Sequence, residues 1–476
     1  MHEGADMDTY RYGGEWHLPE AKSSYNGDLL VNEEKGVIHL LLYRVGDESD
    51  PFGEIPLWGE TPMIFGRLVN GAQILLYGCE TGKRQTEYMG RSSLDISVKY
   101  AFWGLQAREE SELVFNEVQL DFGDIIEWSG ICRYELDRQA CSLKWISEPE
   151  IEISLKNRKI KILAGHSEPF GDIASRKYEL DQRVIFSILP DTKWTIGQFM
   201  HDVYCLRNLI SLGMQGNVSV EEMKYFHEQN LVEAGTGNDA SRRIRGATVN
   251  TRLPRAHIRN RHPYDYLFSL QELLENPHYI DNWFDKYHRM KPIIDLCASV
   301  YLHPDIPAEV FFLNMAQALE TYHSRFVCND PQVLLGMIED EIRGLNQPDD
   351  ADKASSIKKF LWPECQKEYY KYITLSARLR YLVFANGGFS FYTLGLKNED
   401  FIEKVVDSRN YYTHYDEKKA DQAFAGKELD RANAVLWNVI RYYILKELGF
   451  AKEHRNSKIR KEQNRLTERD RPQKPQ

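Results

Sequence analysis

A change in hydrophobic period near residue 190 divides the chain into two kinds of sequence. Before it, short runs rich in β-branched and aromatic residues alternate with polar positions and are separated by Gly, Asn and Asp, as in GVIHLLLY (36–43), PMIFGRLV (62–69) and RVIFSIL (183–189). Period-two patterning in short runs is typical of antiparallel strands. We therefore predict an antiparallel β-rich domain over residues 1–190, arranged as a sandwich or jelly roll.

Helical periodicity begins just after this point. Residues 195–214 carry apolar side chains at helical spacing, with Thr195 as a candidate N-cap. An arginine-rich stretch at 241–262 interrupts the pattern and contains no acidic residue. We predict that residues 191–300 form a helical connector and that 241–262 is an exposed loop within it.

The C-terminal part reads as a bundle of helices. Residues 308–327 place one apolar stripe at three-four spacing, made of Phe312, Met315, Leu319, Tyr322 and Phe326. Residues 427–450 form a second long apolar pattern, which Gly449 is expected to end. The predicted fold class is therefore α+β, with a small antiparallel helical bundle at 301–450.

The net charge limits the ways in which this chain can bind nucleic acid. The 476 residues carry a formal net charge of −11, so a basic coat over the whole surface is excluded and contact must come from local patches. The candidates are the arginine-rich stretch and a basic tail at 451–476. The tail lacks aromatic residues and ends in Pro, Gln and Lys, which predicts disorder.

Cysteine usage indicates a reducing compartment. The seven cysteines are scattered and form no C-x₂-C pair, so neither a disulfide framework nor a simple zinc knuckle is expected. A metal assembled from distant Cys and His residues stays open, but nothing calls for a cofactor. The N-terminus has no signal-peptide pattern, and no apolar run is long enough for a bilayer. We expect a soluble, intracellular protein with no membrane partner.

One short stretch, VVDSRNYYTHYDE (405–417), carries residues suited to catalysis. We expect it to continue a helix that Asn398 caps, and Arg409 follows Ile402 and Val405 on the face that should be apolar. An arginine is rarely buried without a partner, so this position needs a carboxylate, an interface or a phosphate. His414 lies about 140° further round an ideal helix, so a single straight helix does not bring the two side chains together.

These residue types suit RNA cleavage without a metal. Histidine titrates in the range needed to move a proton to or from the 2′-hydroxyl or the leaving 5′-oxygen, and arginine's planar fork matches a phosphate. Asn410 would orient either group by hydrogen bonds. The spacing alone is weak, because RLPRAH (252–257) and RYGGEWH (11–17) also fit it. A structural arginine and histidine is the competing interpretation.

The wider sequence supplies context for this motif. The stretch 405–417, followed by GKELDRANAVLWNVIRYYILKELGF (426–450), resembles the HEPN superfamily of ribonucleases. With the β-rich N-terminal part, NWFDKYHRMKPIIDL (282–296) and ALETYHSRF (318–326), the layout is similar to the ApeA family of anti-phage HEPN proteins. The resemblance implies that Arg409 and His414 are catalytic and that Asn410 is the polar motif residue. It also implies a composite site between two helical protomers.

Two further residues of the bundle are candidates for supporting roles. Glu320 and His323 share one helix face and could line the same cleft as the motif. Both residue types are common at sites where a pKa is shifted. The alternative interpretation is a surface acid and a histidine beside the core.

Aromatic and basic side chains near the motif are candidates for contact with RNA. Tyr411, Tyr412 and Tyr415 flank it and could stack on bases, although one or two of them would equally suit the bundle core. Arg378, with Arg380, could face phosphates or solvent, and solvent is the favoured interpretation.

The function predicted is that of a metal-independent endoribonuclease, a homodimer or larger even assembly, that stops the growth of infected cells. Its partners would be RNA and a phage-encoded trigger, expected to be a protein. The N-terminal domain would sense infection or restrain the nuclease. Two alternatives remain: a HEPN module that binds RNA or a protein without cutting, or a β-sandwich that binds a ligand while the helices only dimerise.

Overall fold

We analysed a computed structural model of the chain. It describes residues 9–469 except for positions 20, 22, 46–51, 53–54, 56–58, 88–90, 106, 133, 141, 147–150, 167–169, 173–176, 180, 235–240, 256–262, 303–304, 345–360, 362–371 and 386–396. The chain forms two compact units, residues 1–272 and 273–476.

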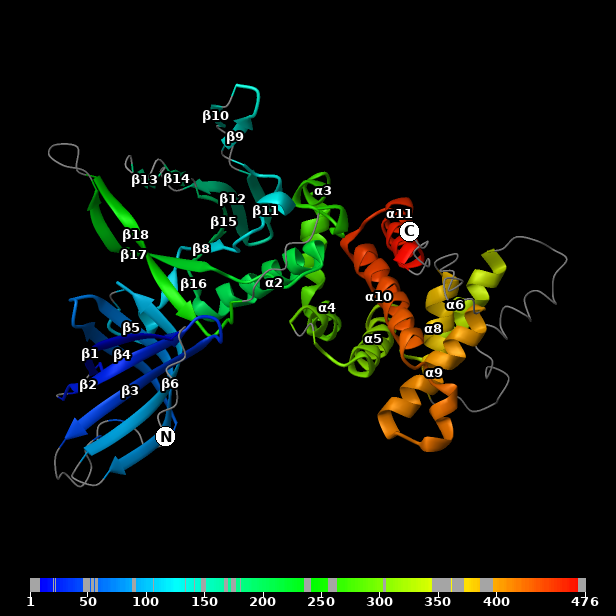
Figure 1. Ribbon diagram of the computed structural model, residues 1–476, viewed down its shortest axis with the longest axis horizontal. Coiled ribbons are helices and arrows are strands. Elements are labelled where there is room, and N and C mark those ends of the chain that lie inside the picture. Colours follow the sequence, from blue (N-terminus) through cyan, green and yellow to red (C-terminus); the bar gives the residue numbers. More distant parts are fainter. Residues whose placement is uncertain are drawn as a thin grey trace, which may run out of the picture. The chain divides into compact units, whose positions relative to one another are not determined.

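The first unit begins with a ring of antiparallel strands, coloured blue in Figure 1. Along the sheet the order is β6-β3-β2-β1-β4-β5, and β5 pairs back with β6 and closes the ring. The predicted antiparallel domain is confirmed, but its first half is a barrel and not a sandwich. The strands are β1 (Thr9–His17), β2 (Tyr25–Asn32), β3 (Val37–Val45), β4 (Glu60–Leu68), β5 (Gln73–Glu87) and β6 (Arg91–Trp103).

Alternate residues of these strands fill the barrel. Trp16, Leu29, Leu40 and Leu76 are fully buried, as period-two patterning requires. The Trp16 indole N–H donates to the Gly27 carbonyl at 3.1 Å, which satisfies its polar atom inside the core. The barrel interior is therefore a packed core.

A second set of strands continues from β6. The sheet runs on through β18 (Ser241–Thr251), β17 (Glu222–Ala234), β8 (Glu117–Asp121), β15 (Gln182–Pro190), β12 (Arg158–His166) and β11 (Ile151–Leu155). Helix α2 (Ile196–Met214) begins at Thr195, which forms the predicted cap through a capping box with Gln198. The ring of Phe199 on α2 lies 5.6 Å from that of Tyr225 on β17, so the helix packs on this sheet.

The predicted connector does not form a separate domain. Residues 241–251, expected to lie in a loop, form strand β18, which pairs with both β17 and β6. Ala247 and Val249 supply the buried face of β18. Because these side chains are small and lie among arginines, the sequence shows no clear apolar alternation that would predict a strand. The β-rich unit therefore extends well beyond residue 190, and residues 256–262 of the arginine-rich stretch lie outside the described residues.

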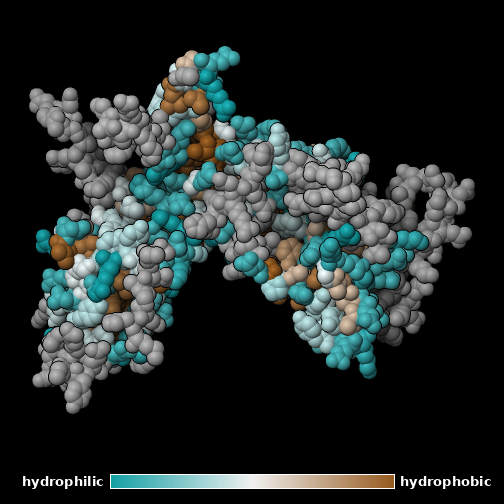
Figure 2. Space-filling model, in the orientation of Figure 1, coloured by the Kyte–Doolittle hydropathy of each residue, from teal (hydrophilic) through white to brown (hydrophobic). Residues whose placement is uncertain are grey.

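Short elements complete the first unit. The hairpin of β9 (Tyr134–Asp137) and β10 (Ser142–Trp145) exposes Leu136, Leu143 and Trp145. Figure 2 shows brown, hydrophobic surface over this hairpin. The others are η1 (Glu110–Glu112), β7 (Val114–Phe115), α1 (Ile126–Ser129), β13 (Phe170–Asp172), β14 (Lys177–Glu179), β16 (Trp194–Thr195) and η3 (Pro263–Asp265), while α3 (Leu270–Leu274) spans the junction of the units.

The second unit is helical. Its elements are α4 (His278–Leu302), α5 (Ala308–Tyr322), the π-helix η4 (His323–Val327), α6 (Pro331–Gly344), α8 (Leu375–Ala385), α9 (Asn398–His414), η6 (Glu417–Gln422), α10 (Lys427–Leu448) and α11 (Lys452–Arg469). Helix α10 packs against α4, α5 and α11, and it ends at Gly449 as predicted, with a φ of 103°. Phe312, Met315 and Leu319 of α5 form the predicted buried stripe. None of the described helices is both long and apolar enough to cross a membrane.

The basic tail is a helix where the sequence predicts disorder. In α11 the Arg455 guanidinium lies 4.5 Å from the centre of the Tyr442 ring, and Ile459 is buried. Contacts with α10 therefore stabilise a segment whose composition alone could not form a core. Residues 470–476 of the tail lie outside the described part of the chain.

Candidate active site in the helical unit

Helix α9 carries the Arg409–His414 motif. It begins at Asn398 with Lys397 at the N-cap, so the prediction that Asn398 is the cap was wrong. Glu399 and Asp400 occupy the first turn, where negative charge is favourable. The helix ends at His414, because Tyr415 adopts a left-handed conformation with a φ of 51°.

The buried face of α9 differs from the predicted one. Ile402 and Val405 are buried as expected, but the face continues through Ser408 and Tyr412. Arg409 is partly exposed at the edge of this face. A polar serine is stable in the interior here because its hydroxyl is fully hydrogen-bonded, which apolar spacing cannot reveal.

Two α9 side chains form hydrogen bonds with the segment that follows the helix. The Ser408 hydroxyl accepts a hydrogen bond from the Phe424 N–H at 2.8 Å and donates to the Lys404 carbonyl at 2.6 Å. The Tyr412 hydroxyl donates to the Phe424 carbonyl at 2.6 Å. Both backbone groups of the buried Phe424 are thus bonded to α9. We call these contacts the Phe424 clamp, and they hold the turn after His414 against the helix.

The motif side chains differ in exposure, because Arg409 is partly exposed and His414 is exposed. The Arg409 guanidinium donates to Asn410 Oδ1 at 3.3 Å, and the described residues include no carboxylate bonded to it. His414 is exposed and has no hydrogen-bond partner within the described ranges. Arg409 and His414 remain about 140° apart on one straight helix, so one protomer directs them to different sides.

Two tyrosines beside the motif are accessible. Tyr415 is 63% exposed, and its ring centre lies 5.6 Å from that of the half-buried Tyr411. Tyr412 is only 8% exposed, and burial raises the pKa of its hydroxyl. Tyr412 is therefore a core residue of the bundle, as the alternative interpretation of the sequence allowed. The rings of Tyr411 and Tyr415 are accessible to a base.

Arg378 and His323 form a buried pair apart from the motif. Arg378 is 5% exposed; its Nη1 lies 3.0 Å from His323 Nδ1, and its Nη2 donates to Asn329 Oδ1 at 2.6 Å. The expectation that Arg378 faces solvent was wrong, because the π-helix after α5 brings polar groups to it inside the bundle. Burial and the Arg378 charge lower the pKa of His323 to about 3. His323 is therefore neutral near pH 7 and unsuited to donating a proton.

Two side chains near this pair, Arg380 and Glu320, are also buried or half-buried in the helical unit. Arg380, expected in solvent, is buried and forms an ion pair with Glu403 at 3.1 Å. Glu320 is half-buried, and its charge favours the protonated form of Arg378, although burial lowers the pKa of Arg378 overall. Among the described contacts, none joins Glu320, His323 or Arg378 to Arg409 or His414.

The described residues offer no ready metal site. Within them, no group of three or more His, Cys, Asp or Glu side chains is arranged to hold a metal ion. The described cysteines, Cys79, Cys132, Cys205, Cys297 and Cys328, are free thiols. Burial raises the pKa of Cys79 to about 12, so this thiol is unreactive. Cys141 and Cys365 lie outside the described ranges.

A β-rich N-terminal unit followed by a helical unit defines the class of this protein as α+β. Two family models match this chain: ApeA N-terminal domain 1 over residues 11–283 and Apea-like HEPN over residues 313–454. The chain belongs to this ApeA-like family of anti-phage defence proteins, and the predicted resemblance is confirmed. No curated protein and no solved structure matches it.

Sequence reasoning missed the Phe424 clamp. Its only local signal is Ser408, a polar residue on an otherwise apolar face. The partner Phe424 lies 16 residues away from Ser408, and main-chain groups carry no sequence signature. Only the folded turn reveals that both groups of Phe424 are bonded.

Proposed function

We propose that this protein is a metal-independent endoribonuclease whose site combines Arg409, Asn410 and His414 from two copies of the chain. The observation that carries this proposal is the environment of Arg409. Arg378 and Arg380 of the same unit are buried and bonded to protein groups, whereas Arg409 is partly exposed and has no carboxylate partner among the described residues. A cation held this way suits a phosphate ligand.

The geometry of α9 favours a composite site. Because Arg409 and His414 lie about 140° apart, a second copy has to supply one of them to complete the site. A two-fold axis beside α9 would place the His414 of one protomer opposite the Arg409 of the other. HEPN domains commonly dimerise and bind RNA, which agrees with this arrangement.

The chemistry requires only these side chains, the RNA and solvent water, which would exchange the proton that His414 does not carry. His414 would take the proton of the 2′-hydroxyl or protonate the leaving 5′-oxygen, and the 2′-oxygen would attack the neighbouring phosphorus. The 5′-oxygen would leave, giving a 2′,3′-cyclic phosphate end. Arg409 would balance the charge that develops on the phosphate, and Asn410 would orient the guanidinium. Dependence on the 2′-hydroxyl restricts such a site to RNA.

This activity fits a role in anti-phage defence. Cleavage of cellular RNA in the cytoplasm would stop the growth of an infected cell before phage multiply. Such a nuclease must be silent in healthy cells, so we assign the N-terminal unit to sensing a phage-encoded trigger. Tyr411 and Tyr415 would stack on bases next to the cut.

Cleavage of total cellular RNA by the purified chain in EDTA tests the proposal, with infected-cell lysate added as a source of trigger. We expect the wild-type protein to leave 2′,3′-cyclic phosphate or 3′-phosphate ends. The variants Arg409→Ala and His414→Ala should cut at least 100-fold more slowly, because general acid–base groups typically contribute roughly 10² to 10⁴ to the rate. Exposed residues of the same unit supply matched controls, Arg343→Ala and His278→Ala, which should cut normally. Cutting that persists in the motif variants places the chemistry elsewhere, and RNA binding without cutting makes the unit a binding module.

A further inference from the structure

Two arginines form a reciprocal pair on the surface of the helical unit. Arg289 of α4 donates from its guanidinium to the main-chain carbonyl of Arg325 in the π-helix η4, and Arg325 Nη1 donates to the carbonyl of Arg289 at 3.2 Å. Each side chain therefore reaches the main chain of the other residue, and both positive charges are held at one place. Both residues are exposed.

Aromatic rings fix the position of Arg289. Its guanidinium carbon lies 4.5 Å from the centre of the Phe326 ring. Phe326 in turn stacks on the buried Tyr322, with ring centres 5.2 Å apart and ring planes 12° from parallel. An exposed arginine ordinarily loses side-chain entropy when it binds a ligand, and here these contacts have already imposed that loss. The pair is therefore preorganised.

No negative charge compensates this pair among the described residues. Neither arginine is ion-paired or hydrogen-bonded to a carboxylate in the part of the chain that the structure describes. Each bond to a main-chain carbonyl occupies only one of the five N–H donors of a guanidinium, so both groups keep donors for a ligand. Like charges held close together repel each other, and an anion bound to both would offset this repulsion.

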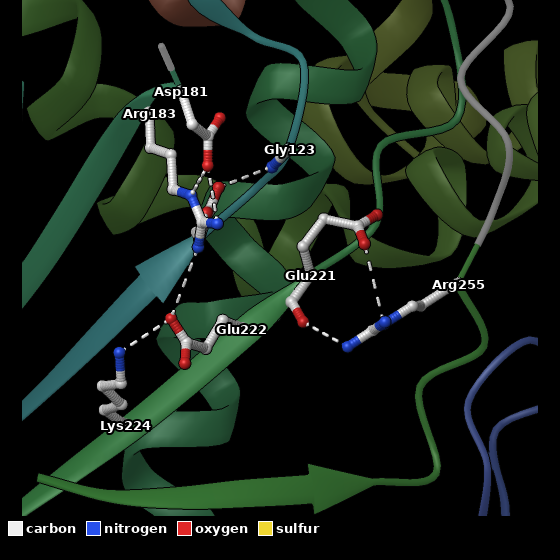
Figure 3. A network of polar contacts seen from close by, with 8 residues as sticks. Gly123, Asp181, Arg183, Glu221, Glu222, Lys224 and Arg255 are labelled. Atoms are coloured by element: carbon white, nitrogen blue, oxygen red, sulfur yellow. Dashed lines mark hydrogen bonds and ion pairs between the residues drawn. The ribbon is translucent and has the colours of Figure 1, made fainter. Parts of the chain in front are cut away.

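Several other cations of the chain are already bonded to acids. In the β-rich unit, Arg183 lines a polar cavity of about 630 Å³ and lies 2.7 Å from Asp181, one of several such contacts in Figure 3. In the helical unit, Lys291 lies 2.6 Å from Asp295 on the same helix. An anion would have to displace a carboxylate at these positions, whereas the arginine pair is open to it.

We propose that Arg289 and Arg325 bind the phosphate backbone of RNA. This inference rests on the proposed ribonuclease function and adds a substrate contact outside its catalytic motif. The planar guanidinium matches the oxygens of a phosphate, and two guanidinium groups together can hold neighbouring phosphates of one strand. Because the chain has a net charge of −11, RNA must be held by local groups of cations such as this pair. The sequence did not indicate the pair, because its members are 36 residues apart.

The pair lies well away from the catalytic motif within the helical unit. The Phe312 ring of α5 lies beside Tyr412 of the motif helix, with ring centres 6.0 Å apart. Arg325 lies about 20 Å further along α5 and its continuation η4, at a rise of about 1.5 Å per residue. Successive phosphates of a stacked strand are about 3.4 Å apart, so a strand of about six nucleotides spans this distance.

Fluorescence anisotropy with the full chain tests this inference, with a labelled 2′-O-methyl polyuridine strand of about 20 nucleotides, which is long enough to reach from the motif to the pair. The strand cannot be cut, because it has no free 2′-hydroxyl. We expect Arg289→Gln/Arg325→Gln to bind it about 10-fold more weakly. The slope of log Kd against log salt concentration should fall by about 1.4, because each phosphate contact to a single strand contributes about 0.7. The matched control Lys291→Gln/Arg343→Gln removes the same charge from exposed positions that are paired with acids, and should bind normally.

Three outcomes would overturn the inference: the wild-type chain does not bind the strand, the two double variants bind it equally well, or the arginine variant loses calorimetric binding of inorganic phosphate but not of the strand. The last outcome would assign the pair to a free phosphate. Because the strand cannot be cut, a failure of the nuclease proposal, seen as RNA cleavage that persists in Arg409→Ala, leaves this result unchanged. Thermal melts establish that each variant is folded. If the arginine double variant is not, Arg325→Gln alone decides, with an expected fall in slope of about 0.7.

Discussion

At the scale of single residues, environment separates arginines and histidines that look alike in the sequence. His323 is enclosed beside Arg378, which lowers its pKa to about 3, whereas His414 is exposed at the end of α9. Arg378 lies inside the bundle, whereas Arg409 lies at the edge of a helix face. The motif residues Arg409 and His414 are therefore more accessible than Arg378 and His323.

The enclosed histidine makes stability depend on pH. The unfolded chain protonates His323 near pH 6.5, but the folded chain does so only near pH 3. The unfolded state therefore binds more protons as pH falls, and folding stability from this group is lost below about pH 7. We expect the free energy of unfolding to decrease by about 2 kcal/mol more between pH 7 and pH 5 in wild type than in His323→Gln.

Urea denaturation followed by helical circular dichroism at both pH values measures this difference. His278→Gln is the control, because His278 is exposed at the start of α4. If wild type and His323→Gln lose the same stability on acidification, His323 is not buried as a neutral residue.

At the scale of elements, contacts between segments decide which residues are ordered. The turn after α9 is rich in Lys and Asp, and Ser408 and Tyr412 hold it through the backbone of Phe424. The basic segment after α10 is ordered in the same way, by packing of Ile459 and Arg455. In both cases the stabilising partner is distant or belongs to another helix.

Removing the clamp should loosen the turn that positions His414. We expect Ser408→Ala to cost about 1 to 3 kcal/mol of stability, because it leaves the buried Phe424 N–H without an acceptor. Tyr412→Phe should cost about 1 kcal/mol. Both variants should also lower the RNA cleavage rate with little change in RNA affinity. Tyr411→Phe, which keeps its ring and breaks no described bond, is the comparison, and equal rates for all three variants would rule out a positioning role.

The helical tail makes a prediction of its own. Ile459 is buried, so Ile459→Ala should destabilise the helical unit by about 2 to 4 kcal/mol. Lys452→Ala, at an exposed position of the same helix, should have little effect. Chemical denaturation of both variants distinguishes a packed helix from a solvated tail. In a solvated tail, neither change would alter the free energy of unfolding.

At the scale of the whole molecule, the chain joins a cavity-bearing β unit to a helical unit of the HEPN type. The proposed site needs two copies, so activity should depend on assembly. Mixing Arg409→Ala with His414→Ala tests this directly. In a mixed dimer one composite site would receive its Arg409 from one chain and its His414 from the other.

We expect the mixture to regain about a quarter of wild-type cleavage after subunit exchange, because half of the dimers are mixed and each has one intact site. Each variant alone should stay inactive. An inactive mixture, with exchange verified by differently tagged chains, would mean that each site takes both residues from one protomer.

Much of the fold and of the candidate site follows from local patterns. The period-two runs before residue 190 predicted antiparallel strands, and the stripe through Phe312 and Leu319 predicted a buried helix face. The motif of Arg409, Asn410 and His414 lies within six residues, so it could be identified without a structure. These features depend on neighbours along the chain, which sequence displays directly.

The sequence by itself therefore determined that a strand-rich part precedes a helical part, the family resemblance and the motif helix. Only the tertiary structure decided that β5 pairs with β6 to close a barrel, that residues 241–251 join the sheet and that Arg378 is buried. It also brought Asp121, Arg183 and Glu222 to one cavity from three strands. The physical reason is that pairing, burial and charge clustering arise between segments far apart in the chain, whose approach depends on the free energy of the whole fold.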